Sequence, residues 1–481
     1  MGVRFSTQNI LDNVTNFVSG RKRKHEETEE NKVIEVALHT PKRKKLLCTA
    51  NYIYQTLFID GKNSDITVCA LGKEHRLHRI YLCQSPYFAS MFGGSWLEST
   101  EEYIKIDIID PSITLKSLQV VFGSLYSTEI EFNPLEIVSV LATATMFQLD
   151  GLIEKCTEIM METINIKTAL GYYQASCRYG DKKLQEVCID WFLVNLMSHY
   201  FNNSDKDLGK IPKSLMLKLV AHPNLFTIQT EYTVYVMLKY WIYIRNHPNE
   251  SFPHLKTVNN YFWNRTDDTP YVYCADEGNT FYLIFKELRL QNLILHDSDI
   301  ALLIKDNIIP KPWVTSVALK QWKHVLRINQ NDETGPVDVP IKLFLQESIR
   351  CGREITSKTR NTWRWAGFHF GIDLLMITDD NKVYVKRSHR SDYEQLLSFQ
   401  TTRHLAIRVT VACLNEQKQI ACMKQSDIQT LSLTKGEEVK LMTLDEDNMH
   451  YPLFISVNLL FTTPVQNQSE QNNSNRAESW Q

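Results

Sequence analysis

The chain has 481 residues, so at about 150 residues per domain it is expected to fold as roughly three domains. Apolar residues make up 43% and charged residues 22% of the chain, values that exclude wholesale disorder. The 53 basic and 55 acidic residues nearly cancel, to a net charge of −2, which excludes a chain-wide positive field for nucleic acid.

Several classes of protein are disfavoured by missing motifs. The first thirty residues contain no apolar signal-peptide core, and no apolar run is long enough to cross a bilayer. Ten cysteines without a CxxC pair indicate reduced thiols in a cytosolic or nuclear protein rather than a zinc site. The motifs GxxxxGK[ST], GxGxxG, HExxH and GxSxG are all missing, so we expect no catalytic residues, no metal and no cofactor. Two function classes remain open: a protein-interaction adaptor, and a nuclear structural or regulatory factor. An enzyme with an unfamiliar active site ranks third.

Residues 1–50 have weak apolar periodicity and carry their bases in blocks, which predicts a disordered tail. Two clusters of four basic residues are either nuclear-import signals or solvated charges of a linker. Because there are two such clusters, both in an accessible tail, we favour nuclear import. The predicted import residues are Arg21, Lys22, Arg23, Lys24, Lys42, Arg43, Lys44 and Lys45.

The tail opens with M-G-x-x-x-[ST], the pattern for myristoylation of Gly2, although so short a motif also occurs by chance. A single acyl chain binds membranes weakly, and the basic cluster at 21–24 would supply a second membrane signal.

Residues 51–150 alternate short strands and helices. The pattern predicts an apolar helix at 52–58, strands at 66–70, 74–78 and 103–108, and helices between and after them. This order resembles the BTB (POZ) domain, and the strings that carry the resemblance are 63–66 (NSDI), 78–82 (HRIYL), 85–92 (SPYFASMF) and 149–152 (LDGL).

The middle of the chain is predicted to be helical, with one apolar face on each helix. The expected helices span residues 167–197, 229–245, 281–295, 297–305 and 313–328. The sequence of residues 230–241 resembles the BACK domain that follows many BTB domains. The tryptophans and cysteines on these apolar faces are expected to be core residues rather than catalytic or ligand-binding residues.

After residue 329 turn residues and short strands take over. Strands are expected at 383–385, 405–411, 428–433, 439–441 and 452–461, with a hairpin turn at 434–437. Seven or eight such strands predict a sandwich or a barrel. Residues 467–481 are rich in Asn, Gln and Ser and are expected to be disordered.

The most distinctive string of this end is residues 360–371 (RNTWRWAGFHFG). Trp363 and Trp365 alternate, as do Phe368 and Phe370, but the two pairs are out of phase across Gly367. A β-bulge there would let the four aromatics share one face. We interpret that face first as sandwich core and second as a surface that binds a peptide of a substrate.

The whole chain from about residue 40 to 465 resembles the germ cell-less family. The strings that carry this resemblance are 41–46 (PKRKKL), 52–58 (YIYQTLF), 94–99 (GSWLES), 122–126 (FGSLY), 350–353 (RCGR) and 363–368 (WRWAGF). The resemblance implies substrate receptors of cullin-3 ubiquitin ligases, association with the nuclear envelope and a role in germ-cell formation.

The resemblance also implies two interaction sites in the BTB domain. Cullin-3-binding BTB domains carry a hydrophobic-x-Glu motif after the third helix, where Trp96 and Glu98 stand here. We expect Trp96 to dock into cullin-3 rather than tuck back into the fold. BTB domains of this type pair through the helix before the first strand, so a homodimer through this helix is expected, with packing onto the same chain's core as the alternative. The expected dimer residues are Tyr52, Ile53, Leu57 and Phe58.

Together these observations predict an α+β multidomain protein. We expect a disordered tail (1–50), a BTB/POZ α/β domain (51–160), an all-α BACK-like helical middle (161–330), a C-terminal all-β sandwich-like domain (336–465) and a second disordered tail (466–481). The expected function is a substrate-specific adaptor of a cullin-3 RING ubiquitin ligase. The alternative is a nuclear-envelope scaffold or transcription regulator with no ligase role.

The expected partners are cullin-3, a second copy of the chain, a protein substrate and inner nuclear membrane proteins, with membrane contact through the N-terminal lipid and no nucleic acid. The expected location is the nucleus and nuclear envelope, with a further plasma-membrane or cytoplasmic pool.

Overall fold

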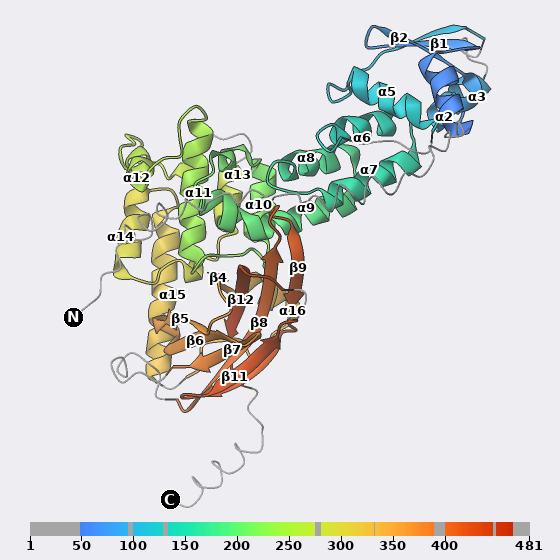
Figure 1. Cartoon of the computed structure of the whole chain (residues 1–481). Coiled ribbons are helices and arrows are strands. Elements are labelled where there is room, and N and C mark those ends of the chain that lie inside the picture. Colours follow the sequence, from blue (N-terminus) through green and yellow to red (C-terminus); the bar gives the residue numbers. More distant parts are fainter. Residues whose placement is uncertain are drawn as a thin grey trace, which may run out of the picture.

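The computed structural model describes residues 49–94, 100–127, 133–274, 280–330, 332–388, 400–445 and 449–464. Figure 1 shows an elongated chain with a small α/β module at one end, helices in the middle and a β module at the other end. The α+β architecture expected from the sequence is confirmed.

The N-terminal module contains a three-stranded sheet in the order β2-β1-β3. β1 (Ile66–Ala70) pairs antiparallel with β2 (Lys73–Leu77) through a tight turn at Leu71 and Gly72, both at positive φ. β1 also pairs in parallel with β3 (Tyr103–Ile106), which ends two residues earlier than expected. The parallel pair requires a crossover between β2 and β3, and short helices supply it.

The helices that the described residues form after β2 in this module are α3 (Arg79–Leu82), α4 (Pro86–Gly93), α5 (Leu115–Ser124), α6 (Ile137–Met146) and α7 (Asp150–Glu162). Ser85 caps α4 by accepting a hydrogen bond from the amide of Phe88, and Pro86 occupies its first turn. The rings of Phe88, Phe122 and Phe147 lie at centroid separations of 5.1, 5.3 and 6.3 Å and fill the core.

The middle of the chain is helical, as expected. Its helices are α8 (Ala169–Tyr179), α9 (Lys182–Asn195), α10 (Lys213–Ala221), α11 (Glu231–Asn246), α12 (Leu255–Trp263), α13 (Thr280–Lys286), α14 (Asp297–Asp306) and α15 (Lys311–Asn329). The single helix expected over 167–197 is in fact two, because Gly180 ends α8 in the left-handed conformation and Asp181 caps α9. Trp191 and Trp241 are fully buried, as expected of core residues.

After α16 (Ile341–Glu347) the chain forms two antiparallel sheets. One has the order β10-β8-β12-β4, with β9 also paired to β8, and the other has the order β11-β7-β6-β5. Buried side chains of both sheets form one apolar cluster, so the expected sandwich is confirmed. The strands are β4 (Ile349–Ile355), β5 (Asn361–Gly367), β6 (Ile372–Asp379), β7 (Lys382–Arg387), β8 (Thr402–Leu414), β9 (Ile420–Gln425), β10 (Gln429–Thr434), β11 (Glu438–Thr443) and β12 (Leu453–Phe461).

The hairpin expected at residues 434–437 is wrong. β10 pairs with β8, whereas β11 pairs with β7, so this turn carries the chain from one sheet to the other. Gly436 takes a positive φ there, and its amide donates to the carbonyl of Arg387 at 3.0 Å. The residue types indicated a turn correctly. The pairing partners of β10 and β11, however, are decided by which side chains become buried and not by the turn between them.

The β-bulge expected at Gly367 is also wrong. β5 and β6 pair continuously from Asn361 to Gly367, and the chain then leaves the strand in a 3₁₀ turn, η8 (Phe368–Phe370). A Cβ at position 367 would lie 2.5 Å from the ring of Trp365, so glycine lets the backbone pass the indole. The phase slip in the sequence marks the end of a strand.

A buried ion pair joins the helical middle to the first strand of the β module. Arg350 on β4 donates from Nε to Oε2 of Glu231 at 3.0 Å, and its Nη2 donates to Oε1. The two side chains are 2% and 0% exposed. Arg350 also donates to the carbonyls of Val220 at 2.8 Å and His222 at 3.1 Å, and Glu231 accepts from the amide of Arg289 at 3.0 Å. Every charge in this cluster therefore has hydrogen-bond partners.

Other contacts reinforce the same junction. Arg408 on β8 donates to Oδ1 of Asn224 at 2.6 Å, and the indole of Trp191 on α9 donates to the carbonyl of Lys418 at 2.8 Å. The helical middle and the β module therefore pack as one continuous body.

We expect Arg350→Met to lower the free energy of unfolding by about 3–5 kcal/mol, because it leaves Glu231 buried without its partner. Arg360→Met is the matched control, since Arg360 pairs with Asp379 at 3.4 Å with side chains 57% and 43% exposed. The control should cost less than about 1 kcal/mol. Urea unfolding of the full chain at pH 7, followed by tryptophan fluorescence, measures both.

The same pair predicts a pH dependence. Burial acts to raise the pKa of Glu231, but the charges and hydrogen bonds of Arg350 and Arg289 outweigh it and lower that pKa below 4.5. The carboxylate therefore stabilises the fold above pH 4.5, and this contribution is lost as the pH falls through the folded-state pKa. The deficit of Arg350→Met should shrink at acid pH, and a constant deficit would contradict the assignment.

Candidate functional site

The predicted cullin-binding residues Trp96 and Glu98 lie outside the described residues, within 95–99. By position in the chain, this segment links α4 to β3 of the BTB-like module. Gly2 and the basic clusters at 21–24 and 42–45 also lie outside the described residues. These assignments stay predictions.

The predicted dimer segment begins the described chain, as α2 (Thr49–Ile53) and a π-helical turn, η2 (Tyr54–Ile59). Tyr52 is 59% exposed, and Ile53 and Leu57 are half-buried. Phe58 points inward instead: it is 8% exposed, and its ring lies 5.3 Å from that of Tyr126. The segment presents an apolar side to solvent that does not include Phe58, because the chain's own core uses that ring.

The aromatic string after residue 360 contributes to the sandwich core. Trp363 and Trp365 are 7% and 6% exposed and belong to the apolar cluster between the sheets, which confirms the core interpretation for these two residues. Phe370 packs against Phe461, with ring centroids 4.4 Å apart. Phe368 begins η8, but its side chain lies outside what the structure describes.

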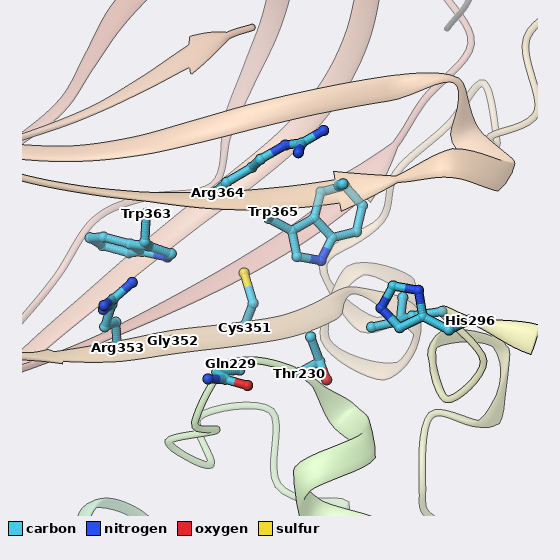
Figure 2. Close-up of a pocket in the computed structure, with 11 residues that line it drawn as sticks. Gln229, Thr230, His296, Cys351, Gly352, Arg353, Trp363, Arg364 and Trp365 are labelled. Atoms are coloured by element: carbon cyan, nitrogen blue, oxygen red, sulfur yellow. The ribbon is translucent and has the colours of Figure 1, made fainter. Parts of the chain in front are cut away.

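Both indoles also line a pocket of 260 Å³ at the junction of the β module and the helical middle. Figure 2 shows the two rings on β5 facing β4, with the start of α11 below and the segment before α14 at one side. The residues that characterise the pocket are Thr230, His296, Cys351, Arg353, Trp363 and Trp365. A concave, largely aromatic pocket between two modules is a usual setting for a binding site.

Hydrogen bonds donated by main-chain amides hold the walls of this pocket in place. The amide of Gln229 donates to the carbonyl of Gly352 at 2.9 Å, which fixes the approach to α11 against β4. Asp299 accepts from the amides of Leu295 at 2.9 Å and His296 at 2.8 Å, which fixes the opposite wall. The pocket is therefore largely pre-formed.

The pocket is positively charged. Arg353 is exposed and makes no ion pair with any described residue, whereas Nε of Arg364 contacts both carboxylate oxygens of Asp373 at 2.8 Å. No Asp or Glu lines the described part of the pocket. Burial raises the pKa of the Cys351 thiol to about 12, so this thiol is protonated near neutral pH and is not an activated nucleophile. The arrangement suits binding of an anionic group.

A more open hollow of 330 Å³ continues from the pocket, since Leu295, His296 and Ala366 border both. Its outer wall is α15, where Trp322 is 59% and Val325 is 37% exposed. Figure 1 shows α15 running beside β5 and β6. Pocket and hollow together form one groove, with a cation at one end and exposed apolar side chains at the other.

The sequence indicated only part of this groove. Thr230 and His296 stand at the starts of α11 and α14, far from the tryptophans in the chain, and no motif connects them. Cys351 and Arg353 belong to the string 350–353, which contributed to the family resemblance but did not by itself indicate a binding site. An exposed arginine two residues after a buried cysteine on a strand was the available signal for the cation.

Two further properties concern the described residues alone. They contain no group of three or more His, Cys, Asp or Glu side chains placed to hold a metal ion. None of the helices they form is long and apolar enough to span a membrane.

Comparison with known proteins extends over nearly the whole chain. The family model of the BTB/POZ domain matches residues 54–164. "Protein germ cell-less" of Drosophila melanogaster is 40% identical over 451 residues, which cover 88% of this chain and 79% of that protein. In Homo sapiens, "Germ cell-less protein-like 1" is 38% identical over 433 residues, 89% of this chain and 84% of that protein. "Germ cell-less protein-like 2" of Homo sapiens is 39% identical over 447 residues, 92% of this chain and 84% of that protein.

Proposed function

The chain belongs to the germ cell-less family, and from this premise we propose that it is a substrate-specific adaptor of a cullin-3 RING ubiquitin ligase. The BTB/POZ domain would bind cullin-3 through Trp96 and Glu98, and the C-terminal region would hold the substrate. Such an adaptor accelerates ubiquitin transfer by raising the local concentration of substrate, and needs no catalytic residue or cofactor of its own. The names of the relatives support a role in germ-cell formation.

The observation that supports this proposal is the arrangement of a BTB module and a β module that borders a pocket in one continuous fold. Figure 1 shows the BTB module at one end of the molecule and the β module at the other, and the groove lies where the β module meets the helical middle. The buried pair of Glu231 and Arg350 fixes the groove to that middle. This arrangement suits a receptor that bridges a ligase and a substrate.

We expect Trp96→Ala and Glu98→Ala each to reduce co-purification of cullin-3 with the full chain by about tenfold or more, because both would remove anchors of the interface. Ser99→Ala, in the same segment but outside the motif, is the control and should bind normally. Full retention of cullin-3 by the double variant would favour the alternative, a nuclear-envelope scaffold or transcription regulator without a ligase role.

We further propose that the protein is a homodimer through α2 and η2, by way of the exposed Tyr52 and the half-buried Ile53 and Leu57. Light scattering of the full chain at tens of micromolar should give the mass of a dimer. Tyr52→Glu combined with Leu57→Glu should give a monomer, because charge in an apolar interface is not compensated. Ile109→Glu, at an exposed apolar residue of the same module, is the control. A monomeric wild type would contradict the proposal.

The proposed location is the nucleus and nuclear envelope, with a plasma-membrane or cytoplasmic pool, and inner nuclear membrane proteins as further partners. A single myristoyl chain on Gly2 would give weak, reversible membrane contact. Gly2→Ala should therefore release the envelope-bound pool, and neutralising Lys42, Arg43, Lys44 and Lys45 should lower nuclear accumulation. Fluorescence imaging of tagged full chains measures both. An unchanged distribution of Gly2→Ala would mean that a protein partner, and not a lipid, retains the protein.

A further inference from the structure

We infer that the groove beside Trp363 and Trp365 binds an extended, acidic peptide segment that adds as a strand to the free edge of β5. This inference rests on the proposed function, since it names the class of substrate segment that the C-terminal region would hold. It commits to a peptide because an open strand edge, two indole donors and an available cation border the same space.

The first argument is the free edge of β5. Among the described strands β5 pairs only with β6, and no main-chain hydrogen bond joins its outer side to another described segment. Four consecutive residues of β5, from Trp363 to Ala366, line the pocket. Because successive side chains of a strand point to opposite faces, a pocket lined by consecutive residues lies along the strand's edge. Such an edge accepts an extended chain through main-chain hydrogen bonds.

The second argument is a pair of hydrogen-bond donors without acceptors. Nε1 of Trp363 is buried and has no hydrogen-bond partner among the described residues, and Trp363 as a whole is only 7% exposed. The indole of Trp365 likewise donates to no described residue, and Figure 2 shows both ring nitrogens on the side of the pocket. A buried donor left unpaired is unfavourable, so a ligand that brings a carbonyl or carboxylate oxygen there gains a hydrogen bond.

The third argument is charge. Arg353 points from β4 toward Trp363 (Figure 2), and it has no carboxylate partner among the described residues. The neighbouring Arg364 is already paired with Asp373 at 2.8 Å. With His296 on the opposite wall and no acidic residue in the described lining, an Asp or Glu side chain of the ligand is the complementary group for Arg353.

The fourth argument is the exposed apolar surface that continues beyond the pocket. The hollow that follows the pocket is bordered by Trp322 and Val325, whose exposed apolar surface would be covered by an apolar side chain of the same peptide. An extended chain advances about 3.3 Å per residue, so a segment of several residues would place its acidic residue at Arg353 and its apolar residue at Trp322.

The test uses a phage-displayed library of random octapeptides, selected in parallel on the full-length protein and on its Arg353→Glu variant. The wild type should enrich peptides that combine an acidic residue with an apolar residue several positions away and that contain no central proline. The Arg353→Glu variant should lose the preference for acidic residues. The most enriched peptide is then synthesised, labelled with fluorescein and titrated by fluorescence anisotropy.

Conservative variants separate binding from folding. Trp363→Phe and Trp365→Phe keep an aromatic ring but remove the N–H, and each should weaken peptide binding about fivefold. Arg353→Ala should weaken it about tenfold. Arg360→Ala, which lies just before β5 and outside the lining, is the matched control and should bind as the wild type does. N-methylation of the peptide amides should abolish binding, because it removes the donors of an added strand. Unchanged urea midpoints establish that the variants are folded.

The inference is overturned if no acidic consensus is enriched, or if the enriched peptide binds Arg353→Glu and Trp363→Phe as tightly as the wild type. Co-purification of cullin-3 distinguishes this failure from failure of the proposed function. Normal cullin-3 binding without acidic peptide selection refutes the peptide site alone. Pocket-dependent peptide binding by a protein that does not bind cullin-3 refutes the ligase role alone.

Discussion

The ion pair between Glu231 and Arg350 is the interaction on which the joined structure depends. Withdrawing two charges from water costs several kcal/mol, and this cost is offset here because the guanidinium also satisfies two helix-end carbonyls and the carboxylate accepts a main-chain amide. A displacement of β4 by one residue would leave both charges buried and unpaired. The neighbours of this pair in the chain, Thr230 and Cys351, line the pocket. The charge pair therefore also joins the two pocket walls that carry Thr230 and Cys351.

Close approach of the backbones at this junction has a second cause. A Cβ on Gly352 would lie 2.6 Å from the carbonyl oxygen of Ile455 and 2.8 Å from that of Thr227, so the absence of a side chain lets the segment before α11 lie directly on β4. The hydrogen bond from Gln229 to Gly352 uses that proximity. For the adaptor role that we propose, this matters because proximity effects depend on orientation: a substrate held at a fixed angle to the ligase gains more than one held by a surface that tumbles freely. In that role the helical middle would be a spacer of defined geometry.

Much of the fold could be predicted from the sequence, and the failures have physical reasons. β1 and β2 were predicted because they combine strand residues with a Leu-Gly-Lys turn, and the family membership followed from strings spread along the chain. β4 was not predicted, because it is buried on both faces over Ile349–Gly352 and even contains a buried arginine, so it shows no alternation. The turn at 434–437 was predicted, but with the wrong strand pairing. Turn residues can be identified from the local sequence, whereas the sheet that each flanking strand joins depends on tertiary packing. The tryptophans were identified from local spacing, whereas His296 and Arg353 meet them only through tertiary packing.

The position of β12 has a consequence for how the protein is made. β12 is the last strand of the described chain, yet it lies between β8 and β4 and is the only described strand that pairs with β4. During synthesis β4 leaves the ribosome long before its neighbour, with the whole second sheet still to follow. Arg350 lies on β4, so its partner Glu231 in the helical middle is not securely paired until β12 has been made and holds β4 in place. A chain terminated before β12 would keep apolar strand edges and this charge exposed to chaperones and proteases, so the survival of the protein depends on translation through β12.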